Sequence, residues 1–224
     1  MKKKPSLRRA RGRPALAAEI GTREALLDAA VALFAEQGVA ATTSSGIAAR
    51  AGVTPAMVHY HFRSRGRLLD AVVDERLARF PGRVFAALAA ADASPAALIE
   101  TIVRRVYEAA EQMPWMPPIW IREVVSEGGT LRDRMLRHFP SDAVGALIDR
   151  LASAQRRRQI PAGVEPRLAF LTIAGIAMLP LATRALWSRI PAMADLTNAQ
   201  LLRHALTVLT AGLTPAKPRS RRKR

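Results

Sequence analysis

Cysteine is absent from this chain of 224 residues, and so is any long uncharged run. Without cysteine the chain has no disulfide framework, no thiolate zinc site and no cysteine nucleophile, which fits a reducing compartment. The longest uncharged stretch, 168–183, has sixteen residues, whereas a membrane-spanning helix needs about twenty apolar ones. No apolar segment of the kind found in secretory signals follows the basic N-terminus. We therefore expect a globular protein of the cytoplasm, without a membrane partner.

Acidic residues are missing from both ends of the chain, which are strongly basic. Residues 1–14 carry seven basic groups and residues 215–224 carry six, so these tails hold +13 of the net charge of +17. Between them, 22 basic and 18 acidic residues leave a net charge of +4. A nearly neutral body with two cationic arms indicates a polyanionic partner, with nucleic acid first and an anionic membrane surface second.

Strand-like alternation of apolar and polar residues is missing too, and the pattern of nearly all residues after residue 20 predicts helix. Ser64 is expected to cap a helix that runs towards Pro81, and Pro117-Pro118 is expected to form a rigid joint. An apolar stripe at helical spacing, from Ile99 to Met113, predicts one buried helix face. The expected helices cover 22–37, 45–51, 54–61, 64–81, 95–113, 119–127, 141–158, 165–187 (bent near Pro180) and 197–213.

The segment Thr42–Phe62, TTSSGIAARAGVTPAMVHYHF, has the features that a helix-turn-helix requires. Ala48 is small where the two helices would cross, and Gly52, four residues on, tolerates the positive φ of a tight turn. Thr54 can cap the second helix, with Pro55 in its first turn, where a missing N–H is harmless. The turn alone is also compatible with an ordinary helical hairpin, and it is the combination of features that favours DNA binding.

Outward-facing groups on the second helix of this motif are the candidates for contacting DNA. Ala56 and Met57 are suited to thymine methyl groups, while Tyr60 and His59 are better suited to phosphates. His59 and His61 lie two residues apart and face different sides of a helix, so we expect no metal site there. We expect no cofactor for this protein. The predicted DNA-binding residues are Arg11, Arg13, Thr43, Thr54, Ala56, Met57, His59, Tyr60 and Arg65.

The N-terminal arm contains Arg11-Gly12-Arg13-Pro14, which resembles the core of an AT-hook. In that motif an extended Arg-Gly-Arg lies in a narrow minor groove, whose enhanced negative potential attracts arginine. Residues 15–80 carry seven basic and seven acidic groups and are formally neutral. We therefore expect the arm to supply most of the nonspecific affinity for DNA.

Residues Thr22–Leu69 resemble the DNA-binding domain of the TetR/AcrR transcriptional regulators. The resemblance rests on TREALLDAAVALFAEQG, ATT before the second helix, IAARAGV, HYHF and the following S-R-x-x-L-L. Many members carry Ser-Lys where this chain has Ser64-Arg65, and Tyr where it has His59. The resemblance implies a homodimer that places one recognition helix per subunit in successive major grooves. It also implies an inducer pocket in the helical body and a dimer interface from its last two long helices.

Methionine and aromatic residues gather around 113–120 and recur further along the chain, in a composition typical of adaptable pockets for hydrophobic molecules. An ordinary core position is an equally good interpretation of each one alone. The predicted residues for a small hydrophobic ligand are Tyr107, Met113, Trp115, Met116, Trp120, Met135, His138, Phe139 and Phe170.

These observations predict an all-α protein with an N-terminal three-helix helix-turn-helix domain and a C-terminal helical ligand-binding and dimerisation domain. The expected segments are a basic arm (1–20), the DNA-binding domain (21–68), the helical body (69–214) and a basic tail (215–224). The expected function is that of a ligand-responsive repressor, acting as a homodimer on a palindromic operator in double-stranded DNA. The sequence contains no phosphate loop, no nucleophile elbow and no metal-ligand spacing, so we do not expect an enzyme. Two alternatives stay open: a small-molecule or lipid carrier held on anionic membrane by its basic tails, and an architectural DNA binder without ligand response.

Overall fold

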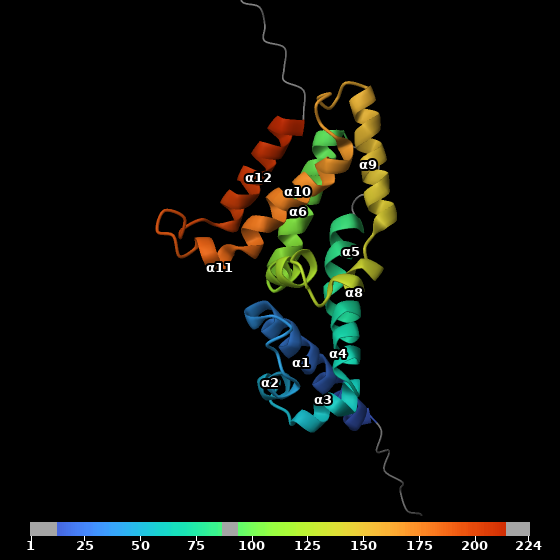
Figure 1. Cartoon of the computed structure of the whole chain (residues 1–224), viewed down its shortest axis with the longest axis vertical. Helices are drawn as coiled ribbons and strands as arrows, with labels where there is room; N and C mark the ends of the chain where they lie inside the picture. Colours follow the sequence, from blue (N-terminus) through green and yellow to red (C-terminus); the bar gives the residue numbers. More distant parts are fainter. Residues whose placement is uncertain (1–12, 87–93, 214–224) are drawn as a thin grey trace, which may run out of the picture. The chain divides into compact units, whose positions relative to one another are not determined.

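The computed structural model describes residues 13–86 and 94–213, and within these ranges every regular element is a helix. The predicted all-α class is therefore confirmed. The chain divides into two compact units, Met1–Val72 and Val73–Arg224 (Figure 1). None of the helices in the described ranges is long and apolar enough to cross a bilayer.

The described part of the first unit consists of α1 (Arg13–Gln37), α2 (Ser44–Arg50), α3 (Pro55–Phe62) and α4 (Arg65–Val72). Helices α2 and α3 pack against each other, and α1 contacts both α2 and α4. Ser64 caps α4 as predicted, because its Oγ accepts a hydrogen bond from the Arg67 amide at 3.2 Å. The helices share one apolar core, which includes Leu26, Leu27, Ala30, Phe34, Ile47, Ala48, Val58, Phe62, Leu68 and Leu69.

Helix α1 begins at Arg13 and not at the predicted Thr22, so the last part of the expected arm is helical. Pro14 stands in the first turn, where its missing N–H costs no hydrogen bond, and the alanine-rich segment after it has high helix propensity. The expectation of an extended Arg-Gly-Arg-Pro is therefore wrong for Arg13 and Pro14. Arg11 lies outside the described residues.

The second unit is arranged around one central helix, α6 (Pro95–Gln112), which contacts α5, α9, α10 and α12 (Figure 1). The predicted apolar stripe of α6, from Ile99 to Met113, is buried along its whole length. The other elements are η1 (Val73–Leu77), α5 (Arg79–Ala86), α7 (Met116–Ile119), η3 (Trp120–Val125), α8 (Arg132–Arg137), α9 (Ser141–Arg156), α10 (Pro166–Ala182), α11 (Arg184–Trp187) and α12 (Asn198–Leu213).

Several boundaries of the second unit differ from the predicted ones, mostly at prolines. Pro81 does not end the fourth helix: π-helical η1 follows α4, and Pro81 then lies in the first turn of α5. Pro117-Pro118 forms part of α7 and not a joint. Proline is tolerated at these places because the first turn of a helix needs no amide donor. Pro180 lies inside α10, which continues to Ala182, and Thr183 separates α10 from α11.

Candidate nucleic-acid interface

The turn between α2 and α3 is closed by two backbone hydrogen bonds of the Schellman type. The Val53 amide donates to the Ala48 carbonyl at 3.0 Å, and the Gly52 amide donates to the Ala49 carbonyl at 3.2 Å. Gly52 adopts a φ of +70°, in the left-handed region that the turn requires and that L-residues avoid. The predicted position of the turn is therefore confirmed, and its hydrogen bonds fix the direction in which α3 leaves α2.

Apolar anchors and one cap hold α2 and α3 in place. Ile47 and Ala48 of α2 are fully buried, and Val58 and Phe62 of α3 are each only 4% exposed. The Thr43 hydroxyl accepts a hydrogen bond from the Gly46 amide at 3.0 Å and so caps α2. Because both helices are anchored from within, their outer sides are left for contacts with a partner.

The outer side of α3 carries the predicted contact residues. Thr54, Ala56, His59 and Tyr60 are exposed and Met57 is half-buried; we call these five residues the α3 face. Thr54 occupies the N-cap position, but its side chain makes no capping hydrogen bond, so the expected cap is wrong. The Thr54 hydroxyl instead stands on the exposed surface.

Tyr60 is the largest exposed side chain of the α3 face, with 63% of its surface accessible. Its hydroxyl donates to Oε1 of Glu19 on α1 at 2.9 Å. This hydrogen bond, together with the negative charge of Glu19, raises the pKa of the Tyr60 phenol above 10.0. The phenol is therefore a neutral donor at physiological pH, and its ring is oriented by α1.

Arg65 has a structural role that the sequence does not reveal. Its guanidinium donates to the Thr42 carbonyl at 2.7 Å and to the Val39 carbonyl, both in the segment between α1 and α2. Arginine is suited to this role because its planar fork presents several donors at once. Arg65 thus ties the start of α4 to the segment that leads into α2, and only its remaining N–H groups are available for a phosphate.

Two further arginines close to α3 were missed by the sequence analysis. Arg63 and Arg67 are exposed and flank Arg65. Arg63 ends α3 with a φ of +59°, an unusual value for a residue with a side chain, and its amide bonds the His59 carbonyl at 2.8 Å. The only signal in the sequence was the density of basic residues in RSRGR.

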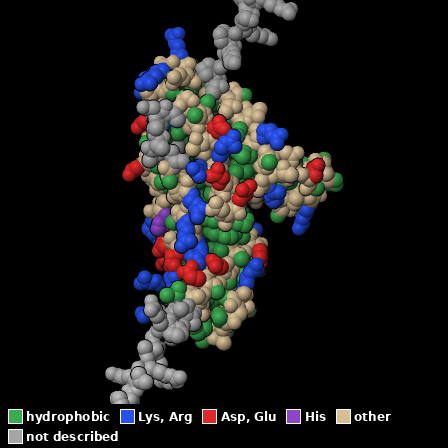
Figure 2. Space-filling model, turned by 180° about the vertical axis from the view of Figure 1, so that it is seen from behind, with side chains coloured by type: hydrophobic (Ala, Val, Ile, Leu, Met, Phe, Trp, Pro, Cys, Tyr) green, Lys and Arg blue, Asp and Glu red, His purple; other side chains and the backbone are tan. Residues whose placement is uncertain are grey.

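On the face drawn in Figure 2, the described side chains do not form a large basic patch. Figure 2 shows basic and acidic side chains interspersed on the face that it draws. Several are paired, such as Arg50 of α2 with Glu36 of α1, whose nearest atoms are 2.7 Å apart. On this face the arginines are therefore local positive groups among acidic residues and do not form a uniform basic field.

The predicted ligand residues all lie in the second unit, but they differ in how deeply they are buried. Two short-range arrangements are seen: the Phe139 and Phe170 rings are 6.2 Å apart, and Nε2 of His138 lies 2.7 Å from Oδ1 of Asp74. Phe139 is 41% exposed, and Trp115, Trp120, His138 and Phe170 are half-buried. The buried ones are Tyr107, Met113, Met116 and Met135.

Part of the first unit is similar to a known protein family. Residues 26–72 match the family model described as bacterial regulatory proteins, tetR family. The chain is 34% identical over 108 residues to the HTH-type transcriptional regulator BetI of Rhizobium meliloti (strain 1021), covering 48% of this chain and 53% of BetI. It is also 34% identical over 91 residues to the HTH-type transcriptional repressor KstR2 of Rhodococcus jostii (strain RHA1), covering 41% and 44%. The matches thus span about half the length of these relatives.

Solved structures resemble the chain over most of its length. The ketosteroid transcriptional regulator KstR2 of Mycobacterium tuberculosis superimposes with a TM-score of 0.68 at 21% identity, covering 86% of this chain and 95% of that protein. The transcriptional regulator FadR of Bacillus subtilis, in complex with stearoyl-CoA, gives a TM-score of 0.62 at 20% identity, covering 84% and 98%. At these identities the likeness establishes the fold, including that of the second unit.

Proposed function

We propose that this chain, whose residues 26–72 match the family model of the tetR bacterial regulatory proteins, is a ligand-responsive transcriptional repressor. It acts in the cytoplasm as a homodimer on a palindromic operator, with residues 21–68 reading DNA and residues 69–214 binding the ligand and the second subunit. The proposal gives the chain a binding function and no enzymatic one.

The observation that carries the proposal is the geometry of α3. A helix that enters the major groove must present a small, mixed set of polar and apolar side chains outwards while its inner side is anchored. The α3 face does so with one hydroxyl, two small or flexible apolar groups, an imidazole and a phenol, and Val58 and Phe62 anchor the other side. Arg63, Arg65 and Arg67 stand next to it for contacts with phosphates.

Exposed leucines on α10 supply the argument for a homodimer. Leu168, Leu171 and Leu179 are each at least half exposed and, with Gly175, follow the spacing of one helical stripe. Helix α12 packs against α10 and exposes Val208. Large apolar side chains that repeat along one face indicate an association surface, and pairing with the same surface of a second copy gives a closed two-fold dimer.

Leu171→Arg tests this surface by placing a charge on it. We expect the variant to sediment as a monomer and to lose affinity for a palindromic site, because each half-site alone is bound weakly. Leu136→Arg is the matched control, since Leu136 is 56% exposed on α8, away from α10 and α12 in sequence. A dimer with unchanged DNA affinity in Leu171→Arg would contradict the proposed interface.

Buried aromatic and methionine side chains of the second unit support a hydrophobic ligand. Tyr107 is only 3% exposed, and its hydroxyl has no hydrogen-bond partner among the described residues, a state that a ligand acceptor would relieve. FadR of Bacillus subtilis has been solved with stearoyl-CoA, and a protein of similar fold, SmeT, with triclosan. A ligand that favours a different spacing of the two α3 helices releases the DNA by its differential affinity for the two states.

The function is tested by measuring binding to DNA enriched from a random double-stranded library and to anionic vesicles. We expect tight binding to the enriched DNA, and a loss of about tenfold or more in a variant that combines Thr54→Ala with Tyr60→Ala, because groove and phosphate contacts disappear. Leu136→Ala serves as the control and keeps full affinity. Binding to vesicles with no preference among DNA sequences would favour the membrane carrier and contradict the repressor.

A further inference from the structure

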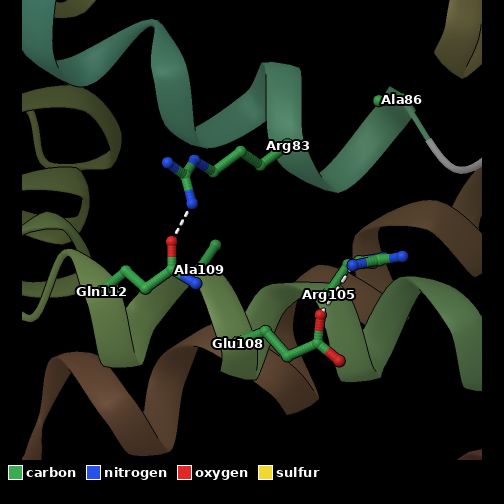
Figure 3. Close-up of a pocket in the computed structure, with 6 residues that line it drawn as sticks. All are labelled: Arg83, Ala86, Arg105, Glu108, Ala109 and Gln112. Carbon is green, nitrogen blue, oxygen red and sulfur yellow. Dashed lines mark hydrogen bonds and ion pairs between the residues drawn. The ribbon is translucent and has the colours of Figure 1, made fainter.

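A surface cavity with four polar residues among the six in its lining lies between α5 and α6 of the second unit. It has a volume of about 380 Å³ and falls in the lower part of the range of small-molecule sites, roughly 300–1,000 Å³. None of the residues predicted to bind a hydrophobic ligand lines it. Its lining is shown in Figure 3 and consists of Arg83, Ala86, Arg105, Glu108, Ala109 and Gln112.

Buried neighbours hold the walls of this cavity in position. On α5 the side chains of Phe80 and Val84, which flank Arg83 in sequence, are buried. On α6 the apolar stripe, including Val106 and Tyr107, is buried on the other side of the helix. Ala86 and Ala109 are short and leave the space between the helices open. The polar groups of the cavity therefore project from anchored helices.

The lining of the cavity has more positive than negative charges. Arg105 and Glu108 form an ion pair with a distance of 2.9 Å on α6. Arg83 reaches across from α5 and donates to the side-chain carbonyl of Gln112, a neutral partner (Figure 3). Two guanidinium groups and one carboxylate give the cavity a formal charge of +1, and a hydrogen bond to an amide does not neutralise Arg83.

We propose that this cavity binds a small polyhydroxylated carboxylate. One carboxylate matches the single excess positive charge, and the fork of Arg83 is suited to hold it with two parallel hydrogen bonds. The oxygens of Glu108 and Gln112 are acceptors for hydroxyl groups of the same molecule. A purely apolar ligand would remove these charged and polar groups from water without giving them any new hydrogen bond, which is unfavourable. The site is separate from the α3 face, so it does not depend on the DNA-binding function proposed above.

The test uses the full chain without DNA and D-gluconate as the probe, measured by isothermal titration calorimetry. Sorbitol, which lacks the carboxylate, and hexanoate, which lacks the hydroxyls, are the matched probes. We expect gluconate to bind and each of the other two to bind at least about tenfold more weakly, because each lacks one of the two kinds of contact.

Variants assign the binding to the cavity. Arg83→Gln and Arg105→Gln each remove one positive charge from the lining and should weaken gluconate binding at least about tenfold. Arg104→Gln is the control, because Arg104 pairs with Glu100 on the same helix and does not line the cavity. Circular dichroism checks that each variant is folded, which the exposure of these arginines leads us to expect.

A second readout works on the unmodified protein. Phenylglyoxal modifies exposed arginines, and gluconate should protect Arg83 and Arg105 from it but not Arg104. The proposal is overturned if gluconate does not bind, if sorbitol or hexanoate binds as tightly, or if Arg83→Gln binds like the parent chain. Protection of all three arginines to the same degree would also overturn it, because binding would then be nonspecific.

Discussion

Replacing Gly52 tests whether the backbone of the α2–α3 turn sets the position of α3. Its φ of +70° lies in the left-handed region, which costs a residue with a Cβ about 1–2 kcal/mol. A β-branched residue is a still poorer fit there. No atom lies within 4 Å of the position that a Cβ would take. The penalty therefore comes from the backbone alone, and an explanation by steric clash would predict no effect.

The magnitude follows from the size of the first unit. Its 72 residues correspond to a total stability of about 4–11 kcal/mol at roughly 0.05–0.15 kcal/mol per residue. For a unit of this size 1 kcal/mol shifts the Tm by about 4–8 °C, so Gly52→Ala should lower the Tm of this unit by about 4–16 °C. Gly52→Val should also disable DNA binding, because a rearranged turn redirects α3.

Thermal unfolding followed by circular dichroism, together with fluorescence anisotropy on enriched DNA, measures both effects. Gly52→Asn should be milder, since asparagine tolerates the left-handed region. Gly21→Ala is the opposite control: Gly21 lies inside α1 with open space around it, and alanine should stabilise the helix by about 0.5–1 kcal/mol. Parental stability and full DNA affinity in Gly52→Val would refute the reasoning.

Three other predictions follow from single features of the chain. Arg65→Lys keeps the charge but offers one nitrogen where arginine uses two for the Val39 and Thr42 carbonyls. We expect thermal unfolding to show a loss of stability of about 1–2 kcal/mol, and an unchanged Tm would contradict the structural role of Arg65. Deleting residues 1–12, which precede α1, should flatten the slope of log K against log salt by roughly 4–5 if five of their charges neutralise phosphates, and an equal slope would exclude that role. Burial raises the pKa of the Tyr107 phenol from an ordinary 10.0 to about 12. As the pH rises, the unfolded chain therefore loses the phenol proton before the folded chain does, and the free energy of unfolding should fall between pH 10 and 12. Tyr107→Phe should remove this part of the pH dependence and, by deleting a buried unpaired hydroxyl, raise stability at neutral pH by about 1 kcal/mol; a lower Tm at neutral pH would show that the hydroxyl has a partner.

The helix-turn-helix could be predicted from sequence because its requirements are local. A small residue at the crossing, a glycine in the turn and apolar anchors at helical spacing all lie between Ile47 and Phe62. The buried stripe of α6 could be predicted for the same reason, because periodicity alone identifies one helical face.

Features that depend on distant parts of the chain could not be predicted. The partners of Arg65 precede it by 23 and 26 residues, and the cavity at Arg83 exists only where α5 meets α6. Helix boundaries near Pro14 and Pro81 could not be predicted, because proline is tolerated in the first turn of a helix but also ends helices. The π-helical segments have no distinctive composition.

The central claim is that two α3 helices of a homodimer read DNA with two-fold symmetry. Selection from a random double-stranded library at physiological salt, followed by sequencing, tests it directly. We predict an inverted repeat whose half-sites are centred about one DNA turn, roughly 34–36 Å, or a multiple of it apart. Enrichment without any shared motif, or of a motif without two-fold symmetry, would contradict the account.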